Sequence, residues 1–169
     1  PSDVPDDLNQ YGWEFSVEDI AAVMRGVGID RAHIVGLSMG GYAALQFGLR
    51  HPGKASAIVA AGAGTGSPPT LREAWLKEAP ATARGFIERG MDVMAEEMGH
   101  SPTRIQLKHK DPRGWQDFMD HLRQHSPRGM SNTMARYQTL RPSLHDFRDE
   151  FAKLTTPVLL AVGDEDAPC

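Results

Sequence analysis

The stretch His33-Ile34-Val35-Gly36-Leu37-Ser38-Met39-Gly40-Gly41 determines how the rest of this chain is interpreted. His33 to Leu37 form a short apolar run that predicts a strand, and Met39 to Arg50 predict a helix. His51-Pro52-Gly53 ends that helix, because proline cannot continue it. Ser38 therefore stands where a strand ends and a helix begins, inside the pattern Gly-x-Ser-x-Gly.

The residue types around Ser38 have a chemical reason. At a sharp junction between strand and helix, a serine hydroxyl points out of the sheet. Gly36 and Gly40 are expected to keep side chains out of the space where the turn and the helix approach one another. The backbone N–H of Met39 lies at the positive end of the helix dipole, where it can donate to a developing oxyanion. The pattern is short and can arise by chance, but the strand before it and the helix after it favour a catalytic serine.

The flanking sequence alternates between helix and strand signals. A helix is expected from Ser16, which can cap it, and two further strands are predicted at 55–61 and 156–162. Thr70 to about Lys153 gives only helix signals, enough for about five or six helices. The alternation predicts an α/β fold with a parallel sheet, and a helical block is inserted between two of its strands.

Within the helical block, capping side chains mark where helices begin. The expected starts are Ser101, Asp111 and Ser126, each followed by proline, and Ser143, which with Asp146 forms a capping box. Met91, Met94 and Met98 share one helical face, as do Trp115, Phe118 and Met119. Such stripes are more typical of packing surface than of a ligand site, although some of these side chains should line an apolar acyl pocket.

Composition limits the classes of partner. The 169 residues carry a net charge of −4, so neither nucleic acid nor an anionic membrane is expected as a partner. No apolar run approaches the roughly 20 residues needed to cross a bilayer, and the first residues do not resemble a signal peptide. The lone Cys169 excludes an internal disulfide and fits a reducing compartment. We therefore expect a soluble, cytoplasmic protein; a homodimer is possible.

Gly36-Leu37-Ser38-Met39-Gly40-Gly41 resembles the nucleophile elbow of the α/β-hydrolase superfamily, in its branch of capped esterases, lactonases and carbon–carbon-bond hydrolases. Thr156 to Asp166 resembles the strand and Gly-x-x-Asp turn that deliver the catalytic acid of this family, which maps the acid onto Asp166. Asp164 and Glu165 are nearby alternatives, since carboxylates after a strand often only form turns. The spacing from Gly163 and the chain order Ser…Asp…His favour Asp166.

This resemblance implies the α/β-hydrolase fold, a mostly parallel sheet with helices on both faces and an inserted all-helical cap. The implied division is core at 1–63, cap at 64–153 and core again at 154–169. The early strands of the family, its second oxyanion donor and the histidine downstream of the acid have no counterpart in this sequence. We therefore expect an internal segment of a longer hydrolase, whose three strands leave sheet edges and apolar faces uncovered.

None of the histidines in the sequence is expected to act as the base; they are His33, His51, His100, His109, His121, His125 and His145. The leading hypothesis is a serine hydrolase of a small, partly apolar ester or lactone, without metal or organic cofactor. Ser38 attacks the carbonyl, a histidine outside this sequence activates it, Asp166 orients that histidine and the Met39 N–H stabilises the oxyanion. The alternatives are a carbon–carbon-bond hydrolase of the same fold and a non-catalytic, hydrolase-like binding protein.

Overall fold

The computed structural model describes residues 3–64 and 66–166 of the chain. These residues divide into two compact units, a sheet unit and a helical unit. The sheet unit takes residues 12–73 and those from 141 onward, and the helical unit takes those up to 11 and 74–140. The stretches 64–73 and 141–153 therefore cluster with the sheet, whereas the first residues of the chain cluster with the helices.

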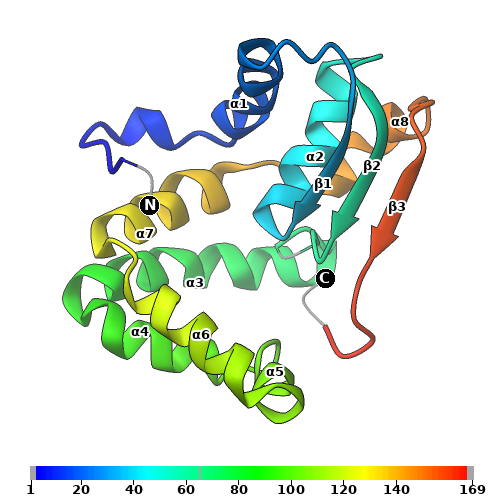
Figure 1. The fold of residues 1–169 in the computed structure, drawn as a ribbon. Helices are drawn as coiled ribbons and strands as arrows, with labels where there is room; N and C mark the ends of the chain where they lie inside the picture. Colours follow the sequence, from blue (N-terminus) through cyan, green and yellow to red (C-terminus); the bar gives the residue numbers. More distant parts are fainter. Residues whose placement is uncertain (1–2, 65, 167–169) are drawn as a thin grey trace. The chain divides into compact units, whose positions relative to one another are not determined.

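The sheet unit is built on three parallel strands, which lie side by side in sequence order (Figure 1). They are β1 (Ala32–Leu37), β2 (Ala55–Ala61) and β3 (Val158–Ala161). Helix α1 (Trp13–Gly26) precedes β1, and helix α2 (Met39–Arg50) connects β1 to β2. The parallel sheet predicted from the alternating pattern is confirmed.

Helix α2 covers one face of this sheet. Tyr42 and Phe47 of α2 and Ile58 of β2 are at most 1% exposed. Successive strand residues point to opposite faces, so Val35 and Leu37 lie on the other face, where they are 73% and 75% exposed. The expected uncovered apolar face is confirmed. In the part of the chain that the structure describes, that face is bare rather than covered by helices as the family resemblance implies.

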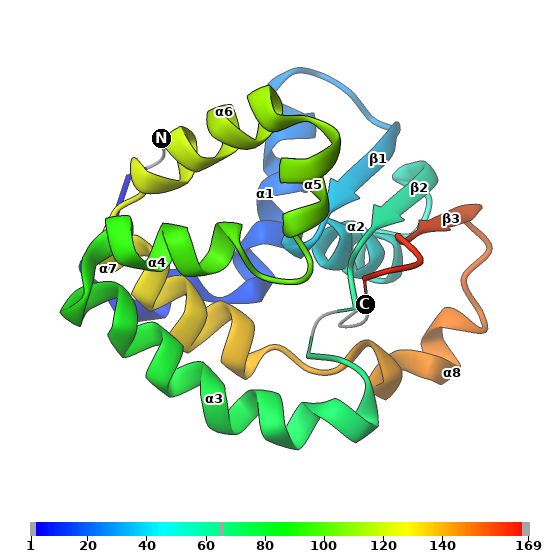
Figure 2. The same ribbon diagram turned by 90° about the horizontal axis from the view of Figure 1, so that it is seen from below.

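The long helix α3 (Pro69–Glu88) begins in the sheet unit, and from residue 74 it belongs to the helical unit (Figure 2). Its further elements are η1 (Leu8–Tyr11), α4 (Gly90–Gly99), α5 (Ile105–Lys110), α6 (Pro112–Arg123), α7 (Pro127–Asn132) and the π-helical turn η2 (Thr133–Gln138). The 3₁₀ turn η3 (Leu144–Phe147) and α8 (Arg148–Phe151) lead back to β3 in the sheet unit. No helix among the described residues has the length and apolar character needed to cross a bilayer.

The methionine stripes form the core of the helical unit. Met91, Met94 and Met119 are buried together with Trp115, and Met98 packs against them. The interpretation of these stripes as packing surface is therefore confirmed.

Local capping signals predicted some helix starts and not others. Asp111 accepts a hydrogen bond from the Gly114 N–H at 2.9 Å, Ser126 accepts one from Gly129 at 3.2 Å, and the capping box of Ser143 and Asp146 is present. The starts at Ser101 and Ser16 are wrong, because each hydroxyl bonds instead to the carbonyl three residues earlier, at 2.7 Å. Helix α5 begins at Ile105 and α1 at Trp13.

Candidate active site

Ser38 occupies a strained turn between β1 and α2. Its backbone angles are φ 54° and ψ −116°, and among the described residues it is the only non-glycine residue with positive φ. Its N–H donates to the Ala61 carbonyl at 2.8 Å, and its carbonyl accepts from the Tyr42 N–H at 3.1 Å. The surrounding ladder and helix therefore hold a conformation that an L-residue otherwise avoids. The side chain is exposed and does not cap α2, so its hydroxyl is not committed to the helix.

Glycines permit the turn at Ser38. The positions that must lack a side chain are not the two, Gly36 and Gly40, that the sequence predicted. A Cβ built on Gly36 would lie 2.0 Å from the Gly40 carbonyl oxygen. A Cβ on Gly41 would lie 2.9 Å from the Ala63 Cβ. At Gly40 a Cβ would meet no described atom within 4 Å. The need for a missing side chain therefore falls on Gly36 and Gly41, and Gly40 takes part through its backbone.

Gly36→Ala is expected to open the elbow and lower the apparent Tm, because the new methyl group collides with backbone that cannot rotate away. Gly40→Ala is the matched control: it adds the same methyl group into open space within α2, where alanine is favoured over glycine by roughly 0.5–1 kcal/mol. Thermal unfolding of both variants measures the difference. Equal Tm values for the two variants would show that the close approach at Gly36 is not rigid.

The carboxyl ends of the three strands meet at one edge of the sheet. Ser38 follows β1, Gly62 follows β2 and donates its N–H to the Ala161 carbonyl at 2.8 Å, and Asp166 lies beyond β3. Gly62 has φ +52°, and a Cβ built there would lie 3.6 Å from Asp166 Oδ2. Because β2 separates β1 from β3, Ser38 and Asp166 follow strands about 10 Å apart, two strand spacings.

Asp166 differs from its two acidic neighbours in exposure. Its side chain is half-buried, and its N–H closes a turn on the Gly163 carbonyl at 3.1 Å. Asp164 and Glu165 are exposed. Of the three carboxylates, only that of Asp166 is both partly shielded from water and next to the residue after β2.

Met39 is the first residue of α2 and is half-buried. The first backbone N–H groups of a helix point along its axis away from the helix, where the dipole is positive. Because Ser38 directly precedes Met39, this end of α2 faces the region in front of the serine. The oxyanion role predicted for the Met39 N–H is consistent with its place at the start of α2 and stays a prediction.

None of the seven histidines, all within the described residues, hydrogen-bonds Ser38. In the sheet unit, His33 lies about 16 Å along β1 from Ser38, at 3.3 Å per residue. His51 lies beyond the far end of α2 and contacts Glu18 at 3.0 Å. His145 lines a cavity of about 810 Å³ on the α2 side of the sheet, and neither Ser38 nor Asp166 belongs to that cavity's lining.

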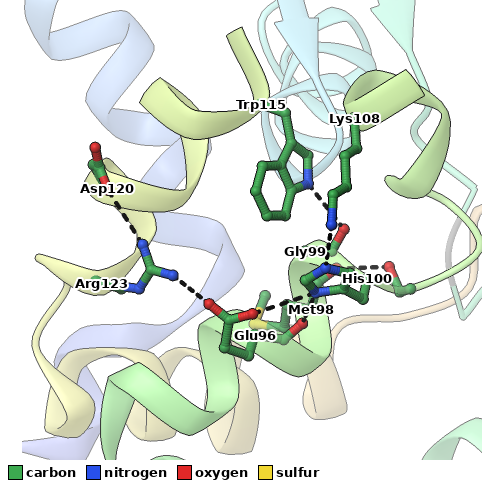
Figure 3. A network of polar contacts seen from close by, with 9 residues as sticks. Glu96, Met98, Gly99, His100, Lys108, Trp115, Asp120 and Arg123 are labelled. Carbon is green, nitrogen blue, oxygen red and sulfur yellow. Dashed lines mark hydrogen bonds and ion pairs between the residues drawn. The ribbon is translucent and has the colours of Figure 1, made fainter. Parts of the chain in front are cut away.

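In the helical unit, histidines make local contacts. His100 lies in a polar network, in which its Nε2 is 2.9 Å from Lys108 Nζ and its Nδ1 is 3.4 Å from a Glu96 carboxylate oxygen (Figure 3). His121 and His125 each contact a carbonyl of their own helix turn, at 2.7 and 2.9 Å. Over residues 3–64 and 66–166, no group of three or more His, Cys, Asp or Glu side chains could hold a metal ion.

Comparison with known families agrees with this geometry. The model described as "Alpha/beta hydrolase family" matches residues 2–168. This chain belongs to the α/β-hydrolase family. The fold class inferred from the elbow and from the strand before Asp166 is thereby confirmed.

Relatives of this α/β hydrolase differ in their named activities. Over 49 residues it is 47% identical to a 2-hydroxy-6-oxononadienedioate/2-hydroxy-6-oxononatrienedioate hydrolase of Burkholderia vietnamiensis, a match that covers 29% of this chain and 17% of that protein. The enol-lactonase of Burkholderia xenovorans LB400 superimposes with a TM-score of 0.75 at 21% identity, over 96% of this chain and 57% of the lactonase. A thermophilic esterase of Thermogutta terrifontis gives a TM-score of 0.74 at 21% identity, over 90% and 54%. The chain thus spans little more than half of these solved hydrolases.

Gly41 and Gly62 have steric or backbone features near Ser38 and Asp166 that the sequence did not predict. Gly41 extends the run of small residues after Ser38, which could have marked it as a close-contact position. Gly62 directly follows β2, and its positive φ lets the chain turn there, beside Asp166.

Proposed function

We propose that this α/β hydrolase is a serine hydrolase that cleaves a small, partly apolar ester or lactone. The observation that carries the proposal is the backbone of Ser38, which has φ 54° at a junction of strand and helix. Strain of this kind persists only where the surrounding structure holds it, and it gathers at catalytic positions. A serine used only to cap α2 would need neither the strain nor the missing side chain at Gly36.

The proposed reaction uses Ser38 as the nucleophile. Its Oγ forms a bond to the substrate carbonyl carbon, while a histidine base takes the hydroxyl proton. The N–H of Met39 donates to the oxyanion of the tetrahedral intermediate. Collapse of this intermediate breaks the ester C–O bond, and the histidine returns the proton to the leaving alcohol. A water molecule then hydrolyses the acyl-enzyme by the same steps.

Asp166 takes the role of orienting the histidine. Ser38 and Asp166 follow β1 and β3, so both lie beyond the carboxyl ends of strands in the same parallel sheet. In this proposal the base comes from outside the described residues, since none of the histidines within them hydrogen-bonds Ser38.

A second candidate is cleavage of a carbon–carbon bond by the same residues. It is favoured by the 47% identical stretch shared with a hydrolase named for 2-hydroxy-6-oxononadienedioate. Both reactions need a nucleophile elbow and an oxyanion donor, so the geometry at Ser38 supports them equally. A binding protein without activity is the remaining alternative.

Turnover measurements separate these functions. We expect the full-length protein to hydrolyse p-nitrophenyl acetate and a small enol-lactone, with little turnover of a ring-fission diketone. Faster turnover of the diketone than of either ester would move the assignment to the carbon–carbon-bond hydrolase. Absence of turnover with all three substrates, together with saturable binding of them, would favour the binding protein.

A further inference from the structure

The chain leaves the sheet unit after residue 73 and returns to it at residue 141. On the sheet side, the two connecting segments are tied to each other by one guanidinium group. Arg72 Nη1 donates to the Gly66 carbonyl at 2.6 Å, and its Nη2 donates to the Arg141 carbonyl at 2.9 Å. The Arg72 side chain therefore joins the two ends of the outgoing segment (residues 66–72). It also binds that segment to the returning one (residues 141–144).

Two buried serines make a second link between the same segments. The Ser143 hydroxyl donates to the Ser67 carbonyl at 2.8 Å, and the Ser67 hydroxyl accepts from the Leu144 N–H at 3.2 Å. Both serines are 3% exposed. Water does not reach these buried hydroxyl groups, so it cannot replace a lost hydrogen-bond partner. Removing one partner therefore leaves the other unsatisfied.

The returning segment is also attached to the helix that begins after Ser38. The Tyr42 hydroxyl donates to the Pro142 carbonyl at 3.1 Å. The guanidinium of Arg141, which is 3% exposed, lies over the Tyr42 ring at 4.7 Å from its centroid. Tyr42 in turn donates its backbone N–H to the Ser38 carbonyl. A continuous set of contacts therefore runs from Arg72 through Arg141 to the first turn of α2.

From these contacts we infer that residues 66–72 and 141–144 form a clasp, which locks both connections of the helical unit to each other and to the helix of Ser38. Arg72 is its positioning residue. Arginine suits this place because its planar fork binds two carbonyls at once, which a lysine cannot do with the same geometry. The clasp restrains the two segments as one element, so that release of either frees both. Its effect on substrate binding rests on the proposed function; the coupling of the segments does not.

Hydrogen exchange measured by mass spectrometry tests the coupling. In Arg72→Met, amides of both 66–72 and 141–146 should exchange at least about 10-fold faster. In the unsubstituted protein, the hydrogen bonds of the charged Arg72 side chain make local opening of these segments less favourable by that factor or more. Arg84→Met is the matched control: it removes an exposed arginine from the same helix α3 and should change neither segment. Faster exchange confined to 66–72 would overturn the inference.

Steady-state kinetics distinguish an effect of Arg72 on substrate positioning from an effect on the stability of the fold. For p-nitrophenyl butyrate, Arg72→Met should raise KM by roughly 5-fold and change kcat by less than about 2-fold, since lost substrate positioning without lost transition-state contacts acts on binding. A lower Tm with an unchanged KM would show that Arg72 only stabilises the fold. If Arg72→Met does not fold, Ser143→Ala, which removes a single hydrogen-bonding hydroxyl from the returning segment, must speed exchange at 66–72 as well. Coupled exchange in a protein without esterase activity would leave the clasp standing and reject the proposed function alone.

Discussion

Ser38→Ala is expected to lower kcat for ester hydrolysis by roughly 10⁴- to 10⁶-fold, the range found when a serine nucleophile is removed from a catalytic triad. In the proposed reaction, the variant loses the atom that forms the acyl-enzyme, whereas the proposed oxyanion donor and the substrate-binding groups remain. The fold should persist, because alanine and serine meet the same strain at φ 54° and the hydroxyl does not cap α2. Steady-state kinetics with p-nitrophenyl acetate, alongside far-ultraviolet circular dichroism, measures both effects.

Ser56→Ala is the control for the first substitution. Ser56 is half-buried near the start of β2, at the end of the sheet away from Ser38, and its loss should leave kcat unchanged. If Ser38→Ala kept more than about a tenth of the activity, the reaction would not proceed through this hydroxyl. Turnover would then have to come from another group, and the assignment of the elbow would be wrong.

Asp166→Asn should lower kcat by about 10³- to 10⁴-fold, since a neutral amide no longer stabilises the imidazolium that forms in the transition state. It also favours the wrong tautomer of the histidine. Asp164→Asn makes the same change two residues away on an exposed side chain and should retain full activity. Both variants remove one negative charge, so comparing kcat between them isolates the position of the carboxylate from the change in net charge.

The opposite result would reassign the acid without removing the nucleophile. If Asp164→Asn were inactive and Asp166→Asn active, the turn after β3 would present a different carboxylate to the histidine. The close approach of Asp166 to Gly62 argues against this outcome. Inactivity of both variants with normal folding would indicate that the local charge of the turn matters more than one oriented carboxylate.

The elbow and the sheet could be predicted because their signals are local. Ser38 and its flanking glycines lie within a few residues, and short apolar runs mark each strand. Helix starts at Asp111 and Ser126 were predictable for the same reason, since a capping side chain followed by proline needs no distant partner. At Ser16 and Ser101 the hydroxyl had a competing local acceptor, which the sequence pattern does not reveal.

The clasp and the role of Gly62 could not be predicted from the sequence. Arg72 and Ser67 bond to residues that are 69 to 77 positions away. Their partners are mainly backbone groups, which every residue carries and which therefore leave no trace in the pattern. Gly62 takes its importance from a carboxylate that follows a different strand. The steric role expected of Gly40 falls to Gly41 because the direction of each Cβ depends on the helix geometry.

In the proposed mechanism, the hydroxyl of Ser38 is an activated nucleophile. A fluorophosphonate probe applied to the full-length protein, followed by mass spectrometry of its peptides, tests this claim most directly. We expect a single phosphonylated peptide with the adduct on Ser38. Protein that is denatured before the probe is added should carry no adduct. An unlabelled Ser38 in the folded protein, or an adduct on another serine, would contradict it.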